Sequence, residues 1–130
     1  MHTLIYTAIT DNIQVDVYPV FEEEQSDLIN RKHIFTYTIS ISNHSEDTIQ
    51  LLSRHWDITD ETSNHVEVDG EGVVGEKPYI EPGATYTYNS FCLLKGFRGA
   101  MWGYYIVETK NGESRKIQIP KFDLISHLLN

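Results

Sequence analysis

The feature that most constrains the fold is an alternation of apolar and polar residues between His33 and Ser42. The apolar positions are Phe35, Tyr37, Ile39 and Ile41, and the residues between them are threonine and serine. A period of two residues places one set on each face of a β-strand, whereas an α-helix needs a period near 3.6. The segment therefore predicts a strand with one buried face and one exposed face.

Several other segments carry the same strand signal, with turn residues between them. Their ranges are Ile13–Tyr18, Thr48–Thr59, Thr85–Asn89, Met101–Thr109 and Ile117–Ile119. Strands at spacings of roughly 8–12 residues predict a sandwich or a barrel. Between the last two segments lies Asn111-Gly112, and Asn-Gly is the strongest short hairpin signal.

We therefore expect one all-β domain over residues 1–130. The expected architecture is an antiparallel β-sandwich of immunoglobulin-like or fibronectin type III-like form, with about seven to nine strands. The segment Phe122–Leu129 is expected to form a short helix or a tail.

A G-x-G-x-x-G string at Gly70, Gly72 and Gly75 has the spacing of a dinucleotide-binding loop. That loop requires a helix directly after it, yet Pro78 follows closely, and proline inside a helix costs about 3 kcal/mol. We therefore interpret the string as a bulged strand or a wide turn at the sandwich rim. The alternative is an anion-binding nest of bare backbone N–H groups, which the carboxylate of Glu71 would oppose.

The net charge is −9, from 10 Lys plus Arg against 19 Asp plus Glu. This balance argues against binding to nucleic acid or to an anionic membrane surface, because both need cations on the protein. The chain lacks an apolar run of the ~20 residues that span a bilayer, and its start does not resemble a signal peptide. The single cysteine, Cys92, indicates a reducing compartment. We expect a cytoplasmic protein.

Three residues with functional side chains lie in the middle of one predicted strand. Arg54 and Trp56 should share a face, and His55 should lie on the opposite one. We expect Trp56 in the core. For Arg54 two interpretations stay open, either a structural pairing with an aromatic ring or with Glu71, or the binding of an anion. His55 is expected to be a structural or surface histidine.

Catalytic and metal-binding signals are weak. None of the six histidines lies in an H-x₃-H pair or beside cysteine at zinc spacing, so we predict neither a metal site nor a cofactor. Cys92 lies in the apolar stretch Phe91–Leu94, which would raise its pKa, so it is expected to be packed and unreactive. Ser53 and His55 lack a positioned acid. The chain is therefore not expected to be an enzyme.

Four motifs are more informative together than singly. They are Ser53–Trp56, Gly70–Pro78, Glu81–Gly83 and Gly99–Gly103, within a region from about residue 5 to Phe122. In order and spacing they resemble the ApaG family, also called CorD. The resemblance implies a fold like fibronectin type III or immunoglobulin domains and no established enzymatic activity.

The resemblance also implies a range of biological settings. Related domains attached to F-box proteins and to a DNA-polymerase-interacting protein look like interaction modules. Bacterial members stand alone, and some are linked genetically to cobalt tolerance and magnesium efflux. Lys77 stands where the family commonly has glutamine, and Phe91–Phe97 replaces a stretch that usually carries small residues and proline.

We therefore expect a non-catalytic binding domain of a bacterial cell, whose partner is another protein or a second copy of the chain. The alternative is a small anion, such as phosphate, pyrophosphate or a nucleotide, bound at the glycine loop and linked to cobalt or magnesium homeostasis. The candidate ligand-binding residues are Arg54, His55, Gly70, Glu71, Gly72, Gly75 and Lys77.

Overall fold

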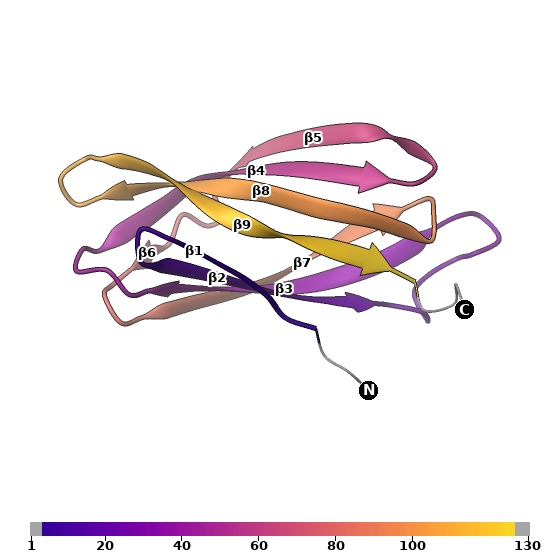
Figure 1. Cartoon of the computed structure of the whole chain (residues 1–130), viewed down its shortest axis with the longest axis horizontal. Coiled ribbons are helices and arrows are strands. Elements are labelled where there is room, and N and C mark those ends of the chain that lie inside the picture. The colour runs from indigo at the N-terminus through magenta and orange to yellow at the C-terminus, as the bar shows by residue number, and fades with distance from the viewer. Residues whose placement is uncertain (1–3, 127–130) are drawn as a thin grey trace.

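The computed structural model describes residues 4–126, which form nine strands in two antiparallel sheets (Figure 1). The first sheet has the order β1-β2-β3-β7, and its strands are β1 (Tyr6–Thr10), β2 (Ile13–Phe21), β3 (His33–Asn43) and β7 (Thr85–Leu94). The second has the order β5-β4-β8-β9, and its strands are β5 (Ser63–Glu71), β4 (Ile49–Asp60), β8 (Arg98–Thr109) and β9 (Ser114–Ile125). The short strand β6 (Tyr79–Ile80) pairs with the start of β4. The predicted antiparallel β-sandwich is confirmed.

The alternating segment forms β3, and the alternation sets which side chains are buried. Phe35, Tyr37, Ile39 and Ile41 are all buried, while the residues between them are half-buried. Because β3 pairs in register with β2 and β7, its neighbours extend the same inner face. Burying one such side chain fully contributes roughly 1.5–3 kcal/mol, so this face stabilises the fold strongly.

Aromatic side chains join the two sheets in the core. The rings of Tyr37, Trp56 and Phe122 form a triangle, with centroids 5.6 to 5.9 Å apart. The buried hydroxyls of Tyr88 on β7 and Tyr105 on β8 form a hydrogen bond with each other. Each phenol hydroxyl therefore provides a hydrogen-bond partner for the other in a region from which water is excluded. Trp56 lies in the core, as predicted.

The two long sides of the sandwich differ. On one side, β9 lies against β1 and β2, the backbone N–H of Gln118 donates to Thr10 Oγ1 at 3.1 Å, and the Tyr6 ring lies 6.2 Å from that of Phe122. On the other side, β5 and β7 are the outer strands of their sheets and lie apart (Figure 1). The space between them leads into a cavity lined by both strands. One side is thus closed and the other is open.

The glycine string begins in the last residues of β5 and continues into a tight turn, rather than the bulged strand or wide turn that was expected. Val73 and Glu76 form an isolated bridge with two backbone hydrogen bonds, and Val74 and Gly75 between them have φ values of 48° and 79°. The chain then continues to β6, and no helix is present between residues 4 and 126. It follows that no helix long and apolar enough to cross a membrane occurs in this described part.

The turn predicted at Asn111-Gly112 is confirmed, because Gly112 has a φ of 82° and β8 and β9 pair on either side of it. The expectation of a helix or tail over Phe122–Leu129 is wrong at its start. β9 continues to Ile125, with Phe122 and Leu124 buried and Asp123 between them exposed. Residues 127–129 of that segment lie outside the described residues.

Candidate functional site

The alternation of β4 divides the predicted site residues between two environments. Arg54 and Trp56 lie on the inner face, whereas His55 and Asp57 lie on the outer face of the second sheet, as the sequence predicts. Four of the seven candidate residues, Arg54, His55, Gly70 and Glu71, line one pocket of about 360 Å³. The side chains of Arg54 and His55 nevertheless have separate partners, since Arg54 contacts the backbone of the glycine turn and His55 contacts Asp69.

Arg54 holds the glycine turn in place. Its Nη1 donates to the backbone oxygens of Glu71 at 3.0 Å and Gly72 at 2.9 Å. Its guanidinium lies over Gly70, where a Cβ atom would come within 2.6 Å of Arg54 Cζ. The glycine at position 70 is therefore explained by the close approach of this guanidinium. The pairing is structural, although it uses backbone oxygens rather than the Glu71 carboxylate.

Several of the groups that an anion would need at the turn are engaged by the chain itself. The N–H of Gly72 donates to Leu52 O and that of Val73 to Glu76 O, both at 2.8 Å. Lys77 Nζ pairs with Glu71 Oε2 at 3.2 Å. A nest binds an anion through unoccupied N–H groups, so this geometry favours the structural interpretation of the glycine turn.

The open side of the sandwich contains an apolar groove, which we call the open-edge groove. It encloses a cavity of about 340 Å³. Its lining residues are Tyr37, Arg54, Trp56, Ile58, Val68, Ser90, Phe91, Cys92, Leu93 and Met101. Phe91 and Leu93 border it from the outer face of β7 and are 69% and 48% exposed. Val66 of β5, two residues from Val68 and on the same face, is 51% exposed.

One strand at this groove is an unprotected sheet edge. β7 spans Thr85–Leu94 without a charged residue or proline, and its pairing with β3 is continuous. The other outer strands are protected in the usual ways. β1 is short, β5 carries three acidic residues, and β9 contains lysine, Pro120 and an irregularity in its pairing. β7 therefore offers backbone groups that another strand can pair with.

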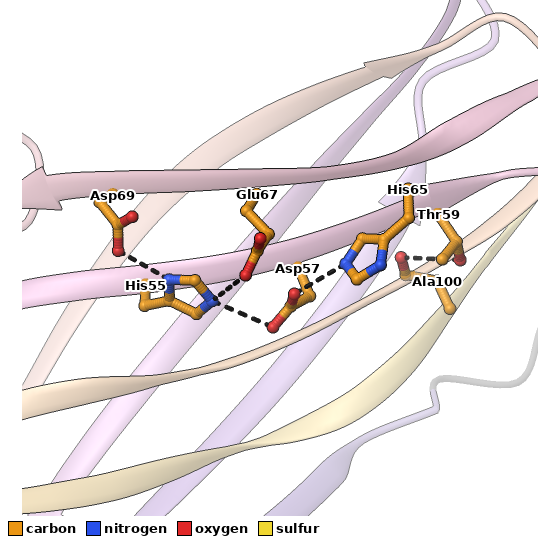
Figure 2. A network of polar contacts seen from close by, with 7 residues as sticks. All are labelled: His55, Asp57, Thr59, His65, Glu67, Asp69 and Ala100. Carbon is orange, nitrogen blue, oxygen red and sulfur yellow. Dashed lines mark hydrogen bonds and ion pairs between the residues drawn. The ribbon is translucent and has the colours of Figure 1, made fainter.

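The outer face of the second sheet carries a second group, which we call the histidine–carboxylate cluster (Figure 2). Its members are His55, Asp57, His65, Glu67 and Asp69. His55 Nδ1 lies 2.6 Å from Asp69 Oδ1, and its Nε2 lies 3.1 Å from Asp57 Oδ2 and 3.5 Å from Glu67 Oε1. His65 Nε2 contacts the other oxygen of Asp57 at 2.7 Å. The hydrogen bond with Asp69 raises the pKa of His55.

Aromatic rings on β8 pack against the two histidines of this cluster. The His55 ring stacks on that of Tyr104, with centroids 4.8 Å apart, and His65 lies 5.4 Å from Trp102. Lys116 Nζ lies 4.2 Å from the centre of the Tyr104 ring, on the side of β9. The rings fix the planes of both imidazoles.

This cluster was not predicted from the sequence, because its histidines and carboxylates do not have the spacing of known zinc-binding motifs. The available signal was the pattern H-x-D on β4 and H-x-E-x-D on β5. Antiparallel pairing sets His55 opposite Asp69 and Asp57 opposite Glu67, so one hairpin places all five side chains on one face. The pattern indicates a cluster only once that pairing register is known.

The fold and these surfaces define the chain as a small antiparallel β-sandwich domain with an open edge. Within that class it belongs to the ApaG family, since the model of the ApaG domain matches residues 23–109. The family indicated by the four sequence motifs is confirmed.

Known relatives cover most of the chain. It is 45% identical to Protein ApaG of Sinorhizobium fredii and 43% identical to Protein ApaG of Rhizobium meliloti, each over 122 residues and 94% of both chains. It also matches the crystal structure of the ApaA protein from Bordetella pertussis with a TM-score of 0.85 and 37% identity, covering 92% of this chain and 98% of that one. These names state no molecular activity.

Proposed function

We propose that this chain is a protein-interaction domain that binds an extended segment of another protein along β7. The observation that carries the proposal is the unprotected edge of β7 beside an open apolar groove. An extended segment that adds to a sheet edge gains main-chain hydrogen bonds from the edge and specificity from side-chain pockets. β7 supplies the edge and the open-edge groove supplies the pocket.

The groove determines the side chains of the bound segment. A strand added to β7 points alternate residues toward the inner face, where Trp56, Val68 and Met101 line the cavity. Apolar residues at every second position of the segment would bury these side chains. Exposed Phe91 on the outer face of β7 would contact the residues between them.

The charge of the chain predicts which residues flank the apolar positions of the bound segment. It also argues against a second copy of the chain as the binding partner. The chain has a net charge of −9, and Asp60 and Glu61 accept hydrogen bonds from the backbone directly after β7. Like charges that face each other across an interface cost free energy, and opposite charges increase the association rate. The expected segment therefore carries lysine or arginine beside its apolar residues.

The test selects peptides from a random unstructured library on the wild-type protein. Selected peptides should contain alternating apolar residues and flanking basic residues. The double variant Phe91→Lys/Leu93→Lys places charges on the edge and should weaken binding at least tenfold. Ile9→Lys on β1, an exposed apolar residue on a different outer strand, is the matched control and should bind as wild type does.

A second measurement separates strand pairing from side-chain docking. N-methylation of alternate peptide amides removes the main-chain donors, so it should abolish binding if the peptide adds to β7. Equal binding by methylated and unmethylated peptides, or by the edge variant and wild type, contradicts the proposal. If sedimentation shows that the wild type is a dimer and the edge variant is not, the strand that pairs with β7 comes instead from a second copy of the chain.

A further inference from the structure

We propose that the histidine–carboxylate cluster is a binding site for a divalent transition-metal ion such as Zn²⁺. His55 Nε2, one oxygen of Asp57 and one oxygen of Glu67 are the ligands, and all three atoms lie within 4.8 Å of one another. The side chains come from facing positions of the β4–β5 hairpin. This site lies on the outer face of the sheet, and none of its three ligands lines the open-edge groove.

The distances match the size of a small tetrahedral ion. Bonds of about 2.0–2.1 Å to nitrogen and oxygen place neighbouring ligand atoms about 3.3 Å apart. His55 Nε2 lies 3.1 Å from Asp57 Oδ2 and 3.5 Å from Glu67 Oε1. Both carboxylate oxygens therefore lie near the required distance from His55, while the oxygens of Asp57 and Glu67 lie within 4.8 Å of each other, so that the exposed Glu67 side chain has to adjust. A water molecule would complete the coordination.

The side chains that contact these ligands are of the kind that orients metal-binding residues in proteins. Asp69 Oδ1 contacts His55 Nδ1 at 2.6 Å, which orients the ring so that Nε2 faces Asp57 and Glu67. Carboxylate partners of this kind raise the basicity of a ligating imidazole, and their loss typically weakens metal binding 10- to 100-fold. His65 holds the second oxygen of Asp57 in the same way, and Tyr104 fixes the plane of the His55 ring.

Charge and ligand type select the class of ion. Among the described residues, the ion pairs of Asp57, Glu67 and Asp69 are all with imidazoles, so three carboxylates face two histidines. An imidazole ligand favours zinc and similar transition metals, whereas Mg²⁺ prefers six oxygen ligands in an octahedral arrangement. We therefore expect Zn²⁺ to bind and Mg²⁺ not to displace it.

The test titrates the full chain with Zn²⁺. Binding is measured by calorimetry and by the NMR resonances of the imidazole nitrogens. One site should fill, with a shift at His55 Nε2 that 100-fold excess Mg²⁺ does not reverse. Glu67→Gln keeps the shape of an exposed side chain and should weaken binding at least tenfold. Asp69→Asn, which touches only His55, should weaken it 10- to 100-fold.

Controls separate this site from adventitious binding and from loss of fold. His44→Gln alters an exposed histidine in a turn outside the cluster and should bind Zn²⁺ as wild type does. Circular dichroism should show Glu67→Gln and Asp69→Asn folded without metal. Equal affinity of wild type and Glu67→Gln, equal shifts at His44 and His55, or no binding at millimolar Zn²⁺ would overturn the proposal.

Discussion

At the residue scale, one step along β4 separates a structural arginine from a polar surface cluster. Arg54 faces inward and holds the turn after β5, while His55 faces outward among carboxylates. Sequence alternation predicts which face each residue occupies, because the period of a strand is fixed. It does not predict their partners, since those depend on the register between β4 and β5.

The close approach of Arg54 to Gly70 gives the first prediction. Gly70→Ala should destabilise the protein by about 1–2 kcal/mol, because a Cβ displaces the guanidinium and breaks its two hydrogen bonds. In an Arg54→Ala background the same substitution should be neutral or stabilising, since alanine suits a strand better than glycine. Urea unfolding of the four proteins measures this coupling, and additive effects would contradict it.

Cys92 gives a second prediction at this scale. It is buried, as expected from its apolar neighbours, and burial raises the pKa of its thiol to about 11. Because the thiolate is the reactive form, native protein at pH 8 should react with a thiol reagent at least tenfold more slowly than protein in denaturant. Equal rates in the two conditions would show that Cys92 is accessible.

At the element scale, a carboxylate at the end of β4 connects the two sheets. Asp60 Oδ2 accepts a hydrogen bond from Lys95 N at 2.7 Å, and Oδ1 accepts one from Gly96 N at 3.1 Å. Both donors lie in the connection between β7 and β8. Burial acts to raise the pKa of Asp60, but these hydrogen bonds and those from Thr62 outweigh it and lower the pKa.

The lowered pKa gives a prediction for the pH dependence of stability. A carboxyl whose pKa falls on folding stabilises the native state above its unfolded pKa of about 3.9, and this contribution is lost as pH falls through the folded pKa. Asp60→Asn should therefore cost about 1–2 kcal/mol at pH 7, and this cost should shrink progressively as pH falls below about 3.9. Urea unfolding across this range measures the difference, and a constant difference would contradict the role of the charge.

Strands with a buried apolar face were predictable, and those without one were not. The segments in β2, β3, β7 and β9 were identified from alternation, and those in β4 and β8 from their apolar residues. β5 was missed because it has only two apolar residues, Val66 and Val68, among polar and acidic ones. β1 was missed because it is short and its apolar residues do not alternate.

At the scale of the whole molecule, the fold class followed from the strand pattern and the glycine turn. Proline at position 78 excluded a helix, and the chain indeed continues as β-structure. The open edge and the histidine–carboxylate cluster were not predictable, because both arise from how the sheets and strands are placed beside one another. Local pattern determines the strands, whereas long-range packing determines these surfaces.

This topology predicts slow folding. Folding rates fall as contacts connect residues that are more distant in sequence, and sandwiches typically fold in milliseconds to seconds. Here Gln118 on β9 contacts Thr10 on β1. Stopped-flow refolding followed by the fluorescence of the buried Trp56 should show that range, and a microsecond phase carrying the full amplitude would contradict it.

The contact between β9 and β1 also affects the order of events during synthesis. A ribosome releases the N-terminal strand long before residues 114–125 emerge from its exit tunnel. Until then the nascent chain exposes apolar surface that β9 later covers, including that around Tyr6. A translational pause upstream of Ser114 would therefore extend the period in which the unfinished chain depends on chaperones to stay unaggregated.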